Sequence, residues 1–443
     1  MPVIDLLPRQ KTTHSSLGAI PHDESTNVGN LEVLSCIFKD QYKLPDEMFN
    51  ERLYLIYGDQ KTTQRIRTIK SRRTKSIRAV DRLDWVLPVP ALFHLRMNYL
   101  YMLNRVHFGA LDDGSLATLH HAMNMWTRKG ISRTNANFHA LEQLVIHSFQ
   151  SRVCALLWNK LGDVRLGSTR EDIDRILCTY DSVRLHSLIR EVVNCYEQES
   201  QYIINLEARN HILFLQHAQT YLLLKYAIKH ADLGLILRAI RRSSVYFHAS
   251  GQHKYAYEML YLLRLVCTDA SSPELQRAVL ANGLVNTSGA EDSWFETDRL
   301  VEFHNGTLKT LFRDRRGSAM TVQYLMEKCA LNTEFYQSLD NNITEFLQHA
   351  ANGKHPQKDA SLDIQAMAEK LFRSGSIAGT QGNSVSHEAI DLFEVALPRL
   401  AGDCLCKFNI KECRDLQDID LNDIDEEAIE DIDTFFEDKN EQD

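Results

Sequence analysis

Asp59 is the first residue whose type and position could do chemistry. It directly follows residues 52–58, a short apolar and aromatic run that ends in Gly58 and has the pattern of a buried strand. A carboxylate at the carboxyl end of a strand lies where side chains converge on a site. The same aspartate could instead accept hydrogen bonds from the free N–H groups of a following helix. The sequence leaves both interpretations open.

His94 is the second candidate. Residues 84–90 predict another short strand, interrupted by two prolines, and a helical pattern follows from about 91 to 108. His94 therefore lies early in a helix that comes directly after a strand, where an imidazole could carry a proton in catalysis. A histidine on an apolar helix is also commonly a packed core residue, and that alternative stays open.

The segment around Glu302 places three polar residues on one helix face. A helical pattern begins near Asp298, and Glu302, Asn305 and Lys309 follow at i, i+3 and i+7. One acid, one amide and one base would then point the same way. An ordinary solvated helix face has a similar composition, so the spacing by itself does not decide between the two interpretations.

Residues 61–82 are very basic and largely helical in pattern. Nine bases fall within this stretch, opposed nearby by Asp81. Such a cluster attracts nucleic-acid phosphates by displacing their counterions, and residues 70–75 would also suit the nuclear-import machinery. A solvated helix face is the alternative. The predicted nucleic-acid-binding residues are Lys61, Arg65, Arg67, Lys70, Arg72, Arg73, Lys75 and Arg78.

The sequence lacks other catalytic and metal-binding motifs. It contains no phosphate-binding loop, no serine nucleophile elbow and no paired-histidine zinc motif, which argues against an NTPase, an α/β-hydrolase and a zincin. Cys404, Cys406 and Cys413 lack the paired spacing of a zinc ribbon, and we interpret them as structural. Nine cysteines in 443 residues, several in apolar helical stretches, indicate reduced thiols and an intracellular location, in the nucleus or cytoplasm.

The elements that must position these residues are mainly helical, so the predicted fold class is mainly α (α+β). Gly162 and Gly251 are expected to end helices, and Asp232 to cap one. No run of about 18 uncharged apolar residues predicts a membrane span. The expected segments are a lead-in at 1–50, the first part of an α/β core at 51–110, a helical insertion at 111–281, the second part of the core with further helices at 282–372, a flexible linker at 373–388 and a C-terminal segment at 389–443.

The net charge of −9 is concentrated at the C-terminus. Residues 415–443 contain fourteen acidic residues and one base, Lys439, so the rest of the chain is slightly basic. Acidic runs of this kind usually stay solvated, and some serve as interaction tails. The alternative function is therefore a helical interaction module whose tail binds basic protein partners or folds back over residues 61–82.

Four segments carry a resemblance when they are taken in order. They are YGDQKTTQRIRTIK at 57–70, WVLPVPALFHLRMNY at 85–99, LVNTSG at 284–289 and ETDRLVEFHNGTLK at 296–309. Over about residues 30–320 the chain resembles a large fungal domain family of unknown function. Proteins of that family look similar to transposon-encoded transposases of the RNase H-like superfamily, which hold two divalent ions about 3.5–4 Å apart with three carboxylates.

The resemblance implies roles for the candidate residues. Asp59 matches the second carboxylate, and Glu302 matches the last, with Asn305 and Lys309 in the positions that follow it on its helix. Both carboxylates would be ligands of Mg²⁺ or Mn²⁺. His94 resembles a histidine of Mutator-like transposases, although Ala91 stands where those enzymes usually carry Cys or Asp. The helices of 111–281 would be an insertion between the second and third carboxylates.

The first carboxylate of such a site is not found. Only about 50 residues precede the first predicted strand, and none of Asp5, Asp23, Asp40 or Asp46 lies in a convincing strand. We therefore expect a truncated RNase H-like α/β core interrupted by a large all-helical insertion. Two carboxylates without the third bind metal poorly. The sequence thus predicts a transposon-derived, catalytically incomplete protein that binds DNA through residues 61–82.

Overall fold

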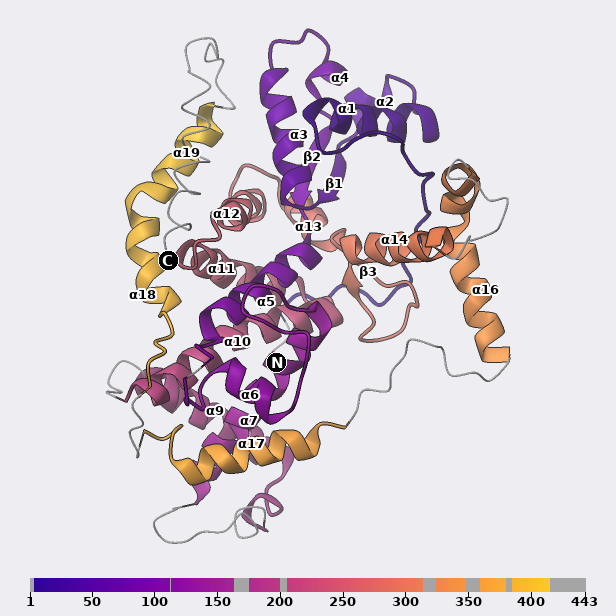
Figure 1. Cartoon of the computed structure of the whole chain (residues 1–443). Helices are drawn as coiled ribbons and strands as arrows, with labels where there is room; N and C mark the ends of the chain where they lie inside the picture. Colours follow the sequence, from indigo (N-terminus) through magenta and orange to yellow (C-terminus); the bar gives the residue numbers. More distant parts are fainter. Residues whose placement is uncertain are drawn as a thin grey trace. The chain divides into compact units, whose positions relative to one another are not determined.

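The computed structural model describes residues 4–111, 113–162, 175–199, 205–313, 324–346, 359–379 and 385–414 (Figure 1). These residues are mainly helical and include two small two-stranded sheets, which confirms the predicted fold class. None of their helices combines the length and the apolar character needed to cross a membrane. The acidic tail at 415–443 lies outside the described residues, as does the middle of the predicted linker at 380–384.

The chain forms two compact units, and neither is continuous in sequence. The first unit comprises Met1–Leu95, Tyr226–His355 and Pro398–Asp443, and the second comprises Arg96–Lys225 and Pro356–Leu397. The divisions near residues 95 and 225 fall inside helices α5 (Leu92–His107) and α10 (Leu206–His230). The segment boundaries expected from the sequence, including the helical insertion at 111–281, stay predictions.

A parallel βαβ arrangement lies in the first unit (Figure 1). Strand β1 (Tyr54–Gly58) pairs in parallel with β2 (Val86–Pro90), with Gly58 opposite Pro90. Parallel strands need a crossover connection, and here helix α3 (Gln60–Arg72) and the short helix α4 (Ala79–Arg82) supply it. Both predicted strands are present, each beginning two residues later than expected.

An aromatic core holds this arrangement together. The ring centres of Phe38 and Phe49 lie 4.8 and 4.6 Å from that of Trp85, and all three side chains are buried. Such ring pairs add stability beyond the burial of their area. The elements that carry or flank these rings are α1 (Asn27–Ser35), the π-helical turn η1 (Cys36–Gln41) and α2 (Met48–Glu51).

The rest of the first unit is helical, apart from one short antiparallel pair. Helix α12 packs against α11, α13 and β2, so it lies beside the βαβ arrangement. The pair β3 (Leu284–Val285) and β4 (Phe295–Glu296) directly precedes α14. The helices and helical turns are α11 (Leu233–Ala249), α12 (His253–Cys267), α13 (Pro273–Ala281), α14 (Thr297–Arg313), η4 (Leu325–Cys329), η5 (Ala330–Asn332), α16 (Thr333–Phe346), η6 (Leu400–Cys404) and α19 (Leu405–Arg414).

Local signals set the helix ends around α11 as the sequence predicted. Asp232 caps α11 by accepting the N–H of Leu235 at 3.0 Å. The same carboxylate accepts the N–H groups of Ile4 and Asp5, so it also fixes the N-terminal segment. Gly251 separates α11 from α12 with a φ of 76°, a left-handed conformation that glycine adopts without steric cost.

The four aspartates that precede β1 all lie outside strands in the structure: Asp5, Asp23, Asp40 and Asp46. Strand β1 has β2 as its single partner among the described residues. The part of the chain that the structure describes therefore offers no strand-borne carboxylate ahead of Asp59.

The second unit is made of helices throughout its described residues. Helix α7 ends at Gly162, as predicted, and packs against α17, where the rings of Trp158 and Phe372 meet edge to face. Most of α5, α10 and α18 also belongs to this unit. The helices that first appear here are α6 (Leu119–Met125), α7 (Phe138–Leu161), α9 (Ser182–Glu199), α17 (Ser361–Ser374) and α18 (Leu392–Arg399).

The predicted linker at 373–388 is packed at residues 375–377, directly after α17. Gly375 ends α17 in the left-handed conformation, with a φ of 64°. Ser376 and Ile377 directly after it are buried. The glycine here shapes a helix end, so the composition that suggested a flexible linker reflects a tight turn in this part of the segment.

Three histidines are buried in the second unit. His107 Nε2 lies 2.9 Å from His217 Nδ1, and Arg152 Nε donates to His211 Nδ1 at 3.1 Å. Burial lowers the pKa of His217 to about 4 and the pKa values of His107 and His211 well below the usual range. These imidazoles are therefore neutral at pH 7, because a charged form would lack solvation.

We expect acid to destabilise the protein through these histidines. The unfolded chain binds protons as the pH falls below about 6.5, whereas the buried imidazoles do not, so the free energy of unfolding decreases between about pH 6.5 and 4. His217 alone contributes roughly 3 kcal/mol over this window. Urea unfolding at several pH values should show a weaker pH dependence for His217→Gln than for wild type. The exposed His230→Gln is the control, and an equal slope in all three proteins would contradict the assignment.

Candidate functional site

Asp59 lies at the carboxyl end of β1, where the sequence placed it, and it caps α3. Its Oδ1 accepts the N–H of Thr62 at 2.8 Å. A Cβ on Gly58 would stand 2.9 Å from the side chain of Thr62, so this close turn from strand to helix requires glycine. The helix-cap interpretation of Asp59 therefore describes its local role, and the carboxylate also borders the hollow described below.

His94 stands in the first turn of α5 and is held by Asp298 from α14. Asp298 Oδ1 accepts the N–H of Phe93 at 3.1 Å, and Oδ2 accepts the N–H of His94 at 3.1 Å. Oδ2 also lies 2.9 Å from His94 Nδ1. One carboxylate thus satisfies two free amides at a helix N-terminus, where negative charge is favourable.

The carboxylates around His94 favour its charged form. The hydrogen bond to Asp298 raises the pKa of His94 against the effect of burial, and the nearby charges of Asp59 and Glu302 raise it further. An imidazole with a raised pKa holds a proton closer to neutral pH than a free histidine does. The acids around His94 therefore stabilise its protonated form.

Glu302 reaches the other nitrogen of the same imidazole. Its Oε1 lies 3.8 Å from His94 Nε2, and its side chain is 44% exposed. Asn305 is half-buried and Lys309 is exposed farther along α14. The structure thus brings Asp59, His94 and Glu302 together, while Asn305 and Lys309 extend the same helix away from the histidine.

A small hollow of about 200 Å³, including its open mouth, lies beside His94. Burial raises the pKa of Tyr255 at its wall, and the negative charges of Asp59, Glu258 and Asp298 add to the rise, so the phenol keeps its proton. The hollow therefore combines proton donors with carboxylates. Its lining residues are Gly58, Asp59, Gln60, Pro90, Ala91, His94, Leu95, Tyr255, Glu258 and Met259.

The two-metal site implied by the resemblance does not fit these side chains as they lie. Asp59 uses one oxygen on Thr62, and Asp298 uses both of its oxygens on α5. Among the described residues, no group of three ligand atoms within 4.8 Å of one another includes Asp59 or Glu302. Mg²⁺ needs near-ideal octahedral coordination by oxygen atoms, so this arrangement supports no metal-dependent step.

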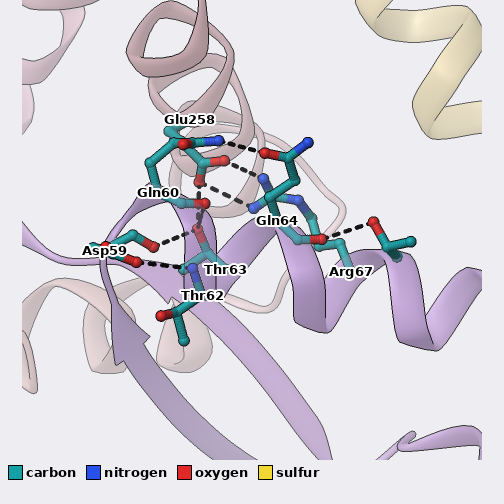
Figure 2. Close-up of polar contacts among 8 residues, drawn as sticks. Asp59, Gln60, Thr62, Thr63, Gln64, Arg67 and Glu258 are labelled. Atoms are coloured by element: carbon teal, nitrogen blue, oxygen red, sulfur yellow. Dashed lines mark hydrogen bonds and ion pairs between the residues drawn. The ribbon is translucent and has the colours of Figure 1, made fainter. Parts of the chain in front are cut away.

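Arg67 is held inside the fold by Glu258 from α12 (Figure 2). Its Nη1 donates to Glu258 Oε2 at 3.0 Å, and its Nη2 donates to Oε1. The guanidinium also lies 4.4 Å from the ring centre of Tyr261. Burial alone would lower the pKa of Arg67, but the carboxylate outweighs burial and raises it. The structure thus places Arg67 in a buried ion pair with Glu258.

The buried carboxylate of Glu258 has a second partner on α3. Thr63 Oγ1 donates to Glu258 Oε2 at 2.9 Å, and Figure 2 shows this bond beside the Arg67 pair and the cap of Asp59. Glu258 is 2% exposed and Arg67 is 12% exposed. Two side chains from α3 therefore satisfy one acid from α12, which fixes the helix that carries the basic cluster.

Lys70 is turned inward as well. Its Nζ donates to the carbonyl of Leu83 at 2.7 Å and to that of Val86, and burial lowers its pKa against the effect of Asp84. The lysine thus joins α3 to the start of β2. The other predicted bases lie at the surface, with Lys61, Arg72, Lys75 and Arg78 exposed and Arg65 and Arg73 half-buried.

Sequence reasoning missed three residues of this site: Asp298, Glu258 and Tyr255. Asp298 lies four residues before Glu302 on the same helix face, a spacing that could have identified it. Glu258 is the single acid in the apolar pattern of α12, and a buried acid requires a partner. Nothing in the sequence distinguishes Tyr255 from the other tyrosines of that helix.

The chain belongs to a family of unknown function, DUF6589, which matches residues 1–355. This match confirms membership of a domain family of unknown function, over a longer stretch than the predicted 30–320. No curated protein and no solved structure matches the chain. Every site residue described above lies within the matched region.

Replacing Asp298 with asparagine is expected to lower the pKa of His94. Asparagine keeps an oxygen acceptor for the α5 amides but removes the charge that stabilises the imidazolium. Histidine NMR titration of the full chain measures the shift. Glu302→Gln is the control and should lower the pKa less, because Glu302 is more exposed and more distant. Equal shifts in the two variants would contradict the role given to Asp298.

The pair of Asp298 and His94 makes the stability of the fold depend on pH in a defined direction. Because the folded-state pKa of His94 is raised, the stability that its protonated ring contributes is fully present below about pH 6.5. That stability is lost as the pH rises through the folded-state pKa. Asp298→Asn should therefore cost more stability at pH 6 than at pH 8.5 in urea unfolding.

Replacing Arg67 with methionine is expected to lower the free energy of unfolding by about 3–5 kcal/mol, because Glu258 would be left charged and unpaired in the interior. Lys61→Met on the same helix is the control and should change it by less than about 0.5 kcal/mol. Urea unfolding measures both. The double variant Arg67→Met with Glu258→Leu should recover part of the loss. If Arg67→Met changed the free energy of unfolding as little as Lys61→Met does, the buried ion pair would be refuted.

Proposed function

We propose that this member of the DUF6589 family is a transposon-derived protein with an incomplete RNase H-like core, and that it binds nucleic acid without cleaving it. The observation that carries the proposal is the position of His94, whose Nε2 lies 3.8 Å from Glu302 Oε1 and which lines the same hollow as Asp59. In the transposases that the sequence resembles, the second carboxylate follows a strand and the last lies on a late helix. The order β1, α3, β2 and then α14 fits that plan.

The lack of cleavage follows from the way the acids are used. Asp298 and Asp59 accept hydrogen bonds from helix amides, and Glu302 lies next to an imidazole whose pKa is raised. The raised pKa of His94 favours positive charge next to Glu302, and positive charge there disfavours the binding of a divalent ion. No upstream aspartate lies in a strand within the described residues. These features support binding as the retained activity.

The proposed binding surface lies along α3 and the turn that follows it. Lys61, Arg65 and Arg72 fall on one face of α3 by helical spacing. Asp81 neutralises part of the surface by pairing with Arg78, with Oδ2 2.8 Å from Nε. Each remaining base that meets a phosphate releases a counterion. We call the following residues the basic surface: Lys61, Arg65, Arg72, Arg73, Lys75 and Arg78.

The triple variant Lys61→Gln, Arg72→Gln and Lys75→Gln is expected to weaken binding to duplex DNA. Log affinity falls linearly with log salt concentration, and each lost phosphate contact makes this slope less steep by about one. The triple variant should therefore show a slope that is less steep by up to about three. Fluorescence anisotropy of the full chain at several salt concentrations measures affinity and slope together. The matched control removes three exposed bases outside the basic surface and should keep the slope: Lys229→Gln, Arg238→Gln and Arg242→Gln.

Two results would overturn the proposal. If neither the full chain nor a chain without residues 415–443 binds DNA at moderate salt, nucleic-acid binding is wrong, and the alternative of an interaction module with an acidic tail takes its place. If Mg²⁺ or Mn²⁺ supports DNA cleavage that Asp59→Asn abolishes, the protein is a nuclease. Tighter DNA binding by the chain without its tail would support the proposal and show that the tail covers the basic surface.

A further inference from the structure

A second group of titratable side chains lies in the first unit, and none of its members lines the hollow beside His94. His14 of the N-terminal segment, His304 of α14 and Glu334 of α16 each offer a ligand atom, and these atoms lie within 4.8 Å of one another. It is the one group of three such residues found among the described parts of the chain. None of the three belongs to the site proposed above, and the sequence alone did not suggest them.

The hydrogen bonds around this group orient its ligand atoms. His14 Nδ1 lies 3.4 Å from the carbonyl of Thr12, which leaves Nε2 directed at Glu334 Oε2, 3.6 Å away. Ser16 Oγ donates to Glu334 Oε1 at 3.1 Å and lies 3.3 Å from His304 Nδ1. A metal-binding histidine usually has its second nitrogen fixed in this way by a carbonyl or carboxylate.

One of the three distances between ligand atoms matches that of a tetrahedral site. Zinc binds imidazole nitrogen and carboxylate oxygen at about 2.0–2.2 Å, which places neighbouring ligand atoms roughly 3.3–3.6 Å apart. The separation between His14 and Glu334 already falls near this value. Small side-chain rotations of His304 would complete the geometry, because all three ligand atoms lie within 4.8 Å.

The state of His304 also suits a metal ligand. Its Nε2 is buried and has no hydrogen-bond partner among the described residues, and such an orphaned polar atom needs an explanation. An imidazole nitrogen without a hydrogen-bond partner can donate its lone pair to a metal ion.

We propose that His14, His304 and Glu334 bind one divalent transition-metal ion, with zinc the preferred ion. Two imidazoles and one carboxylate suit zinc better than magnesium or calcium, which prefer oxygen ligands alone. Three protein ligands leave a fourth position for water, next to Ser16. The ion joins the N-terminal segment to α14 and α16, and this inference is independent of the proposed nucleic-acid binding.

The test uses the full chain after treatment with a chelator. Titration with Co²⁺ as a spectroscopic probe should give the visible absorption of a tetrahedral ion at one equivalent, without the near-ultraviolet band of thiolate ligation, and Zn²⁺ should displace it. His304→Asn and Glu334→Gln are each expected to weaken Zn²⁺ binding by tenfold or more in calorimetry. The control is His230→Asn, an exposed histidine that pairs with Asp292 elsewhere in this unit and should bind Zn²⁺ as wild type does.

A second measurement does not depend on whether the variants fold. Zn²⁺ should slow tryptic cleavage of the wild-type chain after Lys11, because the ion fixes the segment that carries His14. Absence of one-equivalent Co²⁺ binding by folded wild-type protein would overturn the proposal. A thiolate band in the Co²⁺ spectrum, or equal Zn²⁺ affinity in His304→Asn and wild type, would do so as well, since the ion would then bind elsewhere.

Discussion

The buried carboxylate of Glu258 imposes the strongest constraint on the first unit. At 2% exposure it requires polar partners, because burial of an unpaired carboxylate costs several kcal/mol. Arg67 and Thr63 supply those partners, and both come from α3. The pair therefore sets how α3 lies against α12, and through α3 it fixes the cap residue Asp59 and the wall of the hollow. It also removes one arginine from the basic cluster.

A second carboxylate connects the two ends of the candidate site. Asp298 binds the first amides of α5 and the imidazole of His94, although more than 200 residues separate them. This one side chain therefore explains why Glu302, one turn later on α14, lies next to His94. It also explains why the pKa of His94 is raised above its usual value.

Local patterns predicted the elements well because each depends on neighbouring residues. The run before Asp59 forms a strand, Gly251 and Gly162 lie at helix ends, and Asp232 caps a helix. Steric freedom of the backbone and hydrogen bonds between residues close in sequence determine such features. The inward orientation of two bases of the cluster was not predicted. Spacing cannot show that Arg67 and Lys70 face inward, because their partners lie on α12 and on the residues before and within β2.

The sequence by itself determined the mainly helical fold, the end of β1 at Asp59 and the presence of acids on α14, because periodicity and capping act within a few residues. Only the tertiary structure decided which of these groups meet. Asp298 against His94, Glu258 against Arg67 and the group of His14, His304 and Glu334 all join segments far apart in the chain. Such contacts depend on how helices pack and on which charges lose their water, and no local pattern records either.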